Sequence, residues 1–456
     1  MGIDDLVKQH LNGAGRRDCD HWHDGAGIMT HHLGFTLRME LSLQAVDKSV
    51  TIPYWEYTKD AYFFGGSWRK SPIFQENWFG NAGVELGREH HMRQGRWGNL
   101  RVMENAEEFS NVTNMWGLLR SPWNLNAVPF VSRSDAVVGM SYLGGELPGC
   151  STVKACFDSS SLSDMNTCLN GATHGPLHIL IGGQWDVDLG ELGEHLIGSA
   201  HLLLFKDLWR RGFARCPTSI ADCVDKDSGS AEACAALTCE VPDELVEKVG
   251  GAYEVLSSHS GALHWMAATS NGVIRYDQTK GRFYLPGKTH EEEERIWKML
   301  LEKLGNPGKV GEMYTSTAPY DPTFWIIHTT SERLLQYRRL RAGTGADASD
   351  VMSFDETFGY THVDADSDLG VVCDWSGVKE GSLDLPSCVK GTCEGHNSDD
   401  VIPFDLHEIS SALSKKTTNV EFYKWLDPLN DDIPYVYDNF KYDHCAEQGI
   451  YIGSVE

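Results

Sequence analysis

Histidines spaced as on helix faces constrain this chain more than any other feature. His174 and His178 lie four apart in the apolar run THGPLHILIGGQW, residues 173–185, so both imidazoles project from one face of a helix. His328 stands within another apolar run, FWIIH, where its buried ring nitrogens need partners. A lone histidine in such a place is usually a hydrogen-bonded core residue. Several of them on different helices favour a fold that gathers imidazoles at one interior point.

Two more histidines near the N-terminus share this property. Apolar residues at helical spacing predict a helix over 3–12 that carries His10 on its inner face. A second helix is expected over 32–47, and its apolar spacing turns His32 inward. His23 lies in the polar loop between these two helices. Three helical segments and one loop therefore direct histidines toward a common interior.

The rest of the chain predicts fewer regular elements. Residues 60–170 indicate loops, and helix returns at about 174–181. The alternating stretch TSNGVIRYDQTKGRFYLP predicts a hairpin. Further helices are expected at about 290–304, with Thr289 as N-cap, and from Asp321 to about Arg341.

The domain organisation follows from these elements. We expect a single domain over 1–456, since no repeat of fixed period is visible. Within it, 184–310 is a cysteine-containing insertion, and 343–456 is a loop-rich C-terminal part. The insertion is either a disulfide-stapled decoration or a lid over the site, and the first interpretation is favoured.

Charge and cysteine content limit the partners and the compartment. The chain has 39 Lys and Arg against 65 Asp and Glu, a net charge of −26, which disfavours binding to nucleic acid or to an anionic membrane. No apolar run is long enough to span a bilayer. Twelve cysteines without a CxxC pair, and the sequon Asn111-Val112-Thr113, favour disulfides and a secreted or otherwise oxidising location. No signal peptide opens the chain, so we expect that a secretory leader has been trimmed from it. The oligomeric state is left open.

The histidine set points to a metal. Imidazole suits copper, zinc and iron, but no HExxH motif and no 2-His-1-carboxylate pattern is present. An all-histidine site fits a pair of copper ions best. The candidate ligands are His10, His23, His32, His174, His178 and His328.

These residues stand in an order that carries a family resemblance. A helical histidine precedes an H-x8-H pair, with an aromatic residue three positions and a glutamate eight positions later, and then PYWEY. An H-x3-H pair and two glycines come next, then DPTFWIIH with Glu-Arg-Leu behind it, and finally YVY. The positions are His10, His23, His32, Phe35 and Glu40, then His174, His178, Gly182, Gly183, Asp321, His328, Glu332, Arg333 and Leu334, then Tyr435 and Tyr437. In this the chain resembles the type 3 copper proteins, namely tyrosinases, catechol oxidases and molluscan-type haemocyanins, and most closely the short bacterial-type tyrosinase core.

The resemblance implies a fold and an activity. The implied fold is mainly α, a four-helix bundle core that holds a dinuclear copper site, with long loops, a few short strands and a disulfide-stapled insertion. The implied activity is that of a copper oxidoreductase, in which two copper ions and O2 convert small phenols or o-diphenols to o-quinones. A haemocyanin-like O2 carrier without turnover is the alternative, and a copper-binding structural protein is the third candidate.

Some positions depart from the family pattern. Ile327, His31 and Leu33 replace a common histidine, tryptophan and arginine. Gly175 replaces an asparagine that helps hold a water in many tyrosinases, which favours diphenol over monophenol oxidation. In some members a cysteine two residues before the middle ligand of the first copper forms a thioether with it.

That position is His21 if His23 is the ligand, whereas Cys19 would fit only if His21 were the ligand. His21 therefore competes with His23. Other expectations concern the surroundings of the metal. Gly175, Phe324 and Ile179 are candidates for the substrate pocket, Asp321 is an N-cap, and Glu40 and Glu332 form structural ion pairs.

Overall fold

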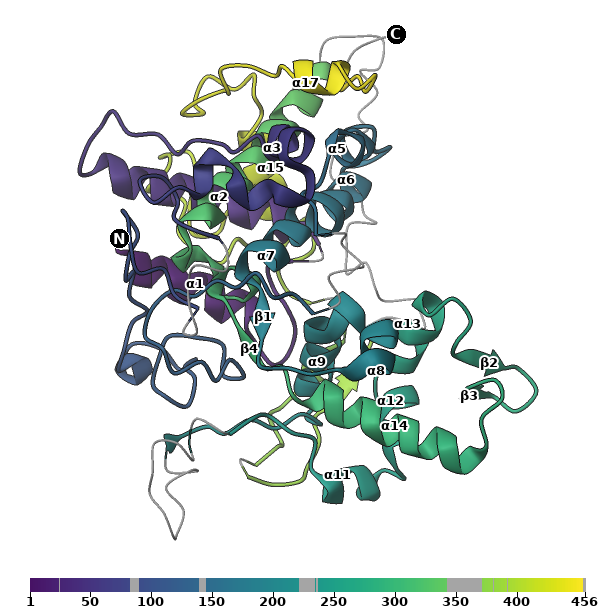
Figure 1. Ribbon diagram of the computed structural model, residues 1–456. Coiled ribbons are helices and arrows are strands. Elements are labelled where there is room, and N and C mark those ends of the chain that lie inside the picture. The colour runs from purple at the N-terminus through teal and green to yellow at the C-terminus, as the bar shows by residue number, and fades with distance from the viewer. Residues whose placement is uncertain are drawn as a thin grey trace.

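The computed structural model describes residues 1–23, 25–82, 90–138, 145–220, 234, 237–342, 371–379, 381–391 and 393–453. Helices predominate, and Figure 1 shows them in two groups. One group contains α1, α2, α7 and α15, and the other contains α8, α9 and α11 to α14. The expectation of a mainly helical fold is confirmed.

The first group is built around four helical segments, which carry four of the six candidate histidines. These are α1 (Ile3–Ala14), α2 (Gly27–Gln44), α7 (Gly175–Gly182) and α15 (Pro322–Ala342). Helix α15 is buried at every position from Pro322 to Gln336, and it packs on α2. A helix buried all round must lie at the centre of its group.

Shorter elements surround these four. They are α3 (Tyr57–Phe64), η1 (Gly65–Lys70), η2 (Pro72–Phe74), η4 (Ala106–Glu108), α5 (Cys150–Phe157), α6 (Leu162–Cys168), η5 (Leu169–His174), η8 (Glu312–Tyr314), η9 (Ala318–Tyr320), α16 (Asn419–Trp425) and α17 (Asp443–Ala446). Helix α6, the π-helical η5 and α7 follow one another without a break.

The second group lies within the expected insertion and has its own apolar core. Its elements are α8 (Gly190–Leu196), η6 (Gly198–Ala200), α9 (His201–Arg210), α11 (Asp243–Lys248), α12 (Ala252–Ser257), α13 (Ala262–Thr269) and α14 (His290–Gly305). Leu208, Leu256 and Trp297 belong to this core, which also takes in Met115 and Trp123 from outside the insertion. Thr289 caps α14 in a capping box with Glu292, as expected.

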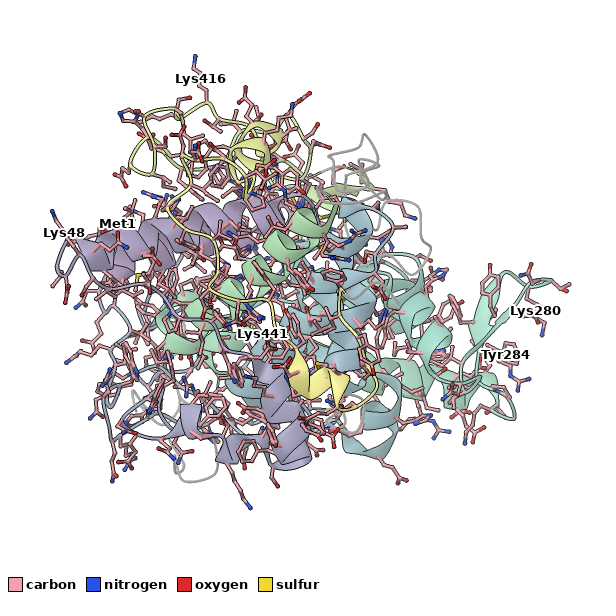
Figure 2. The ribbon with its side chains drawn as sticks, turned by 90° about the horizontal axis from the view of Figure 1, so that it is seen from above. Met1, Lys48, Lys280, Tyr284, Lys416 and Lys441 are labelled. Atoms are coloured by element: carbon pink, nitrogen blue, oxygen red, sulfur yellow. A yellow bond between two sulfur atoms is a disulfide. The ribbon has the colours of Figure 1, made fainter. Side chains whose placement is uncertain are left out.

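Strands are short and pair locally in the described part of the chain. β1 (Gln184–Trp185) pairs with β4 (Lys309–Val310), and β5 (Val372–Asp374) pairs with β6 (Ser387–Val389), both antiparallel. β2 (Arg275–Asp277) and β3 (Arg282–Tyr284) form the expected hairpin, with Tyr276 opposite Phe283. In Figure 2 this hairpin projects from the body of the molecule, with Lys280 near its tip.

The sequence misjudged two helical regions. Helix α2 begins at Gly27 rather than at His32, because its first turn is buried on several sides and shows no amphipathic spacing. Helices α5 and α6 lie in the stretch expected to be loops. Each has at most eight residues, and the disulfide Cys156–Cys168 joins them, so tertiary constraints stabilise helices too short to show a clear period.

Five disulfides between described residues confirm the expected use of the cysteines. They are Cys19–Cys393, Cys150–Cys445, Cys156–Cys168, Cys216–Cys239 and Cys373–Cys388. The first two tie the C-terminal part to segments far upstream. Such bonds persist in oxidising surroundings. Among the described helices, none combines the length and the apolar character needed to span a membrane.

Candidate metal centre

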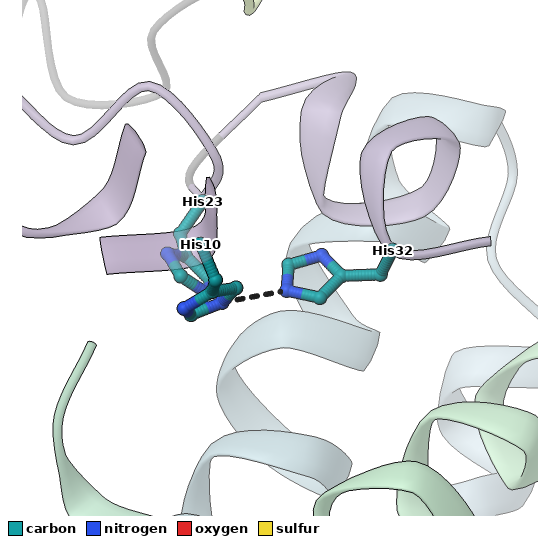
Figure 3. A group of neighbouring side chains, drawn as sticks. All are labelled: His10, His23 and His32. Carbon is teal, nitrogen blue, oxygen red and sulfur yellow. Dashed lines mark hydrogen bonds between the residues drawn. The ribbon is translucent and has the colours of Figure 1, made fainter. Parts of the chain in front are cut away.

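Three of the candidate histidines, all from the N-terminal part of the chain, lie close together. His10 comes from α1, His32 from α2 and His23 from the loop between them, and one ring nitrogen of each lies within 4.8 Å of the other two. The Nε2 atoms of His10 and His32 are 3.3 Å apart, along the dashed line of Figure 3. We call these three residues the first cluster.

The outer nitrogens of the first cluster face oxygen acceptors. Nδ1–H of His10 donates to the Ser316 carbonyl at 2.7 Å, and Nδ1–H of His32 donates to the Ile28 carbonyl at 2.9 Å. Nδ1–H of His23 donates to the Asp20 carboxylate at 2.9 Å. A neutral imidazole that donates from Nδ1 has its one ring proton there, which leaves a lone pair on Nε2.

The other three candidates form a second cluster. His174 is the last residue of η5, His178 lies one turn later in α7, and His328 lies in α15. Nε2 of His174 is 2.7 Å from Nε2 of His178 and 3.1 Å from Nε2 of His328. Nδ1–H of His178 donates to the Met313 carbonyl at 2.5 Å.

The two clusters adjoin. The ring of His32, in the first cluster, stacks on that of His328, in the second, with centroids 4.3 Å apart. Phe324 lies one turn before His328 and contacts both clusters, because its ring centroid is 4.2 Å from that of His328 and 5.5 Å from that of His10. Phe324 is fully buried. One aromatic ring therefore lies beside imidazoles of both clusters, namely those of His10, His32, His178 and His328.

Burial keeps the imidazoles of His10, His32, His174, His178 and His328 neutral. Desolvation, followed by the neighbouring His23, lowers the pKa of His10 to about 3. Desolvation lowers the pKa of His178 to about 4 and those of His32, His174 and His328 well below the ordinary value. Neutral imidazole is the form that binds a metal.

This donor set fits a metal ion in each cluster. In the first cluster every Nδ1 is already a donor, so the converging Nε2 lone pairs have no proton to share. Lone pairs brought this close repel one another, and a cation between them would remove the repulsion. Imidazole nitrogens without carboxylates suit copper, zinc or iron among the common metals.

The structure shows which of His21 and His23 belongs to the first cluster. The ring of His21 turns away from the first cluster, with Nδ1–H donating to the Glu394 carbonyl at 2.7 Å and Nε2 lying 3.2 Å from Asp18. Cys19 is bonded to Cys393, so it is not available for a thioether. His23, not His21, is the histidine that the fold brings to the cluster.

The acidic residues of the motifs, Asp321, Glu40 and Glu332, differ in their hydrogen-bond and ion-pair partners. Asp321 accepts the Thr323 N–H at 2.9 Å, as an N-cap does, and also forms a buried ion pair with Arg133. The prediction that Glu40 and Glu332 form ion pairs is wrong. Glu40 accepts from the Ile52 N–H and the Gln44 amide.

Glu332 accepts the hydroxyls of both tyrosines of the C-terminal motif. The distances from its Oε2 are 3.1 Å to Tyr435 and 2.9 Å to Tyr437. Burial raises the pKa of Glu332 to about 7. The ion pair in this motif is made by the next residue, Arg333, with Glu56 of the PYWEY segment at 2.7 Å.

The remaining pocket candidates lie on α7. Gly175 and Ile179 are half-buried. Gly175 follows η5 directly, and a Cβ there would lie only 2.8 Å from the Asn170 carbonyl. A π-turn inserts one residue into a helix and is frequent at functional sites. Here it sets the direction of His174, which closes the turn.

Some residues that shape the site gave no signal in the sequence. The carbonyls of Ser316 and Met313 are backbone acceptors, which any residue could supply. Asp20 could have been noticed, because it stands three residues before His23 in a loop that places both side chains together.

The comparisons with known proteins agree with this geometry. Residues 2–195 match the family model described as the common central domain of tyrosinase. The matched range contains five of the six clustered histidines, and His328 lies beyond it. None of the curated proteins is significantly similar to the chain.

Proposed function

Since this chain belongs to the type 3 copper family, we propose that it oxidises small phenols or o-diphenols to o-quinones with O2. The observation that carries the proposal is the pair of adjoining three-histidine clusters. Proteins of this family hold two copper ions and use O2. Two Cu(I) ions held there would supply one electron each to O2, whereas a single copper ion would supply only one.

In this proposal each cluster holds one copper ion. His10, His23 and His32 hold the first, and His174, His178 and His328 hold the second. The convergence of their nitrogens supports the assignment. The carbonyls of Ser316 and Met313 orient the rings of His10 and His178, so that these two ligands present Nε2 and keep the ring proton on Nδ1.

Phe324 restricts the space beside the ligands. Phe324 is fully buried and contacts both His328 and His10, so in this proposal it forms an apolar wall beside the ligands that a phenol ring would meet. Gly175 and Ile179 complete the proposed pocket from α7.

A preference for o-diphenols forms part of the proposal. Gly175 stands where many tyrosinases have an asparagine, and a side chain there would press on the Asn170 carbonyl. The chain therefore lacks an amide at this position that could hold a water near the substrate hydroxyl. An o-diphenol needs no hydroxylation and is the simpler substrate.

The wider context of the protein is proposed as follows. The disulfides between described residues are compatible with secretion or with another oxidising compartment. Residues 1–456 act as one domain, in which 184–310 is an insertion with its own core. The bacterial-type subgroup stays a prediction.

Oxygen uptake with L-DOPA and with tyrosine tests the proposed function. Copper-loaded protein is expected to consume O2 and to form quinone with L-DOPA, and to react more slowly with tyrosine. Reversible O2 uptake without quinone would indicate a carrier instead. The absence of O2 uptake in a protein shown to hold two copper ions would overturn both. H178A serves as the inactive control, since it lacks one ligand of the second cluster.

A further inference from the structure

Asp20 makes more contacts around the first cluster than a turn residue requires. Its carboxylate is buried, and one oxygen, Oδ1, accepts three N–H groups. These are the Trp22 backbone N–H at 3.0 Å, the His23 backbone N–H at 3.1 Å and the His23 Nδ1–H at 2.9 Å. A single oxygen therefore fixes both the backbone and the ring of His23.

The second oxygen faces cations from another part of the chain. Nζ of Lys206 lies 3.9 Å and Nη2 of Arg210 lies 3.8 Å from Oδ2, and both residues belong to α9 of the insertion. Two cationic side chains of the insertion thus lie beside the buried carboxylate of Asp20.

The backbone of Asp20 is also anchored. Its carbonyl accepts the Nε2–H of His396 at 2.5 Å, and the neighbouring Cys19 is bonded to Cys393. Ala26 N–H donates to the His396 carbonyl at 3.2 Å on the other side of the loop. The C-terminal part therefore clamps the loop on both sides of His23, the one clustered histidine that is not on a helix.

We propose that Asp20 is the positioning residue of His23: its carboxylate fixes the ring and makes Nε2 a stronger donor to the metal of the first cluster. This inference rests on the proposed function, because it takes His23 as a metal ligand. A carboxylate that accepts the outer N–H of a ligating histidine fixes its tautomer and raises its basicity. The insertion takes part in the site through Lys206 and Arg210, and so it is more than a remote decoration.

The chain contains its own control for this proposal. Asp18 and His21 repeat the arrangement of Asp20 and His23 two residues earlier, with the carboxylate 3.2 Å from the ring nitrogen at the same spacing of three residues. His21 belongs to neither histidine cluster. D18N and D20N therefore make the same chemical change in the same loop, but only D20N touches a clustered histidine.

The test is copper affinity, measured on the full-length protein by competition with a Cu(I) chelator. D20N is expected to weaken one of the two copper ions by about 10–100-fold and to leave the other unchanged. D18N should bind both as the wild type does. An asparagine oxygen still accepts the two backbone N–H groups, so a role limited to the turn predicts no loss in D20N. The unfolding temperature of the metal-free variants checks that the loop remains folded.

The outcomes separate the two proposals. Two copper ions in the wild type, with unchanged affinities in D20N, would overturn the role of Asp20 and leave the proposed function intact. One ion in the wild type, weakened by D20N, would overturn the dinuclear function and support the role of Asp20. A wild type that binds no copper would overturn both.

Discussion

The imidazoles of His32 and His328 lie parallel, with their planes inclined by 3° and their centroids 4.3 Å apart. One belongs to the first cluster and the other to the second. Each ring therefore limits the orientation of the other, so that the two metal positions are coupled through direct packing.

This coupling distinguishes two ligand substitutions. H23A is expected to lose the first copper and to keep the affinity of the second. H32A should lose the first copper and also weaken the second, because His328 loses the ring that supports it. Copper stoichiometry and chelator competition measure both effects. Equal affinity for the remaining copper in the two variants would contradict the coupling.

Substitution of His21 tests which loop histidine serves the site. H21A is expected to retain two copper ions, because the ring of His21 contacts Asp18 and the Glu394 carbonyl rather than the first cluster. Metal analysis of H21A beside H23A decides the matter. Loss of one copper from H21A alone would reverse the assignment.

Phe324 and Phe35 provide a matched pair for the proposed substrate wall. Both rings are fully buried, but Phe324 contacts both clusters, whereas Phe35 lies 6.0 Å from His10 and packs on Trp325. F324L and F35L should each cost about 1 kcal/mol of unfolding free energy, since the volume changes little. Only F324L is expected to change KM for an o-diphenol. A shift of KM in F35L of the same size would remove the special role of Phe324.

Glu332 should make stability fall with rising pH. Its pKa is about 7 in the folded protein, above the ordinary value of 4.5, so the folded state holds a proton that the unfolded state releases between these values. The free energy of unfolding therefore decreases from about pH 5 to pH 7, by up to about 3 kcal/mol. E332Q removes this decrease and should exceed the wild type in stability at pH 8. Urea titrations at pH 5 and pH 8 measure the difference.

Glu312 supplies the contrast. It is also buried, but it forms an ion pair with Arg120 at 2.6 Å. E312Q leaves that guanidinium without its anion and should lose about 3–5 kcal/mol at both pH values. Equal pH profiles for E332Q and the wild type would show that Glu332 is not the group responsible.

The histidine clusters were predictable because their signal is local. His10, His32 and His328 stand at inward positions of helices whose spacing or apolar character is visible in the sequence, and His174 and His178 need only one turn of helix. The groups that orient the rings were not predictable in the same way. The carbonyl of Ser316 meets His10 only after the chain has folded.

The errors have the same origin. Glu332 lies beside Arg333, and an acidic residue next to a basic one suggests ion pairs for both. The fold instead brings Tyr435 and Tyr437 to Glu332 and gives Arg333 to Glu56. The π-turn that ends at His174 also has no local signature, because it depends on how α6 and α7 are held.

Removal of the Cys19–Cys393 bond should affect the first copper. The bond lies four residues before His23, and the C19S/C393S variant frees the loop from the C-terminal part. Lower copper occupancy is expected, together with a loss of about 2–5 kcal/mol in stability. C216A/C239A removes a bond in the insertion and should lose stability without losing copper. Equal copper content in the two variants would argue against a clamp on this loop.

The two long-range disulfides constrain the order of biosynthesis. Cys393 and Cys445 both follow His328, the last clustered histidine. A ribosome therefore delivers all six imidazoles before either bond can close. Metal that binds before the Cys19–Cys393 bond forms finds the His23 loop unconstrained. Metal that arrives later must reach His23 in a loop that the disulfide already holds in place. The oxidation state of these cysteines would thus determine when the apoprotein accepts its metal.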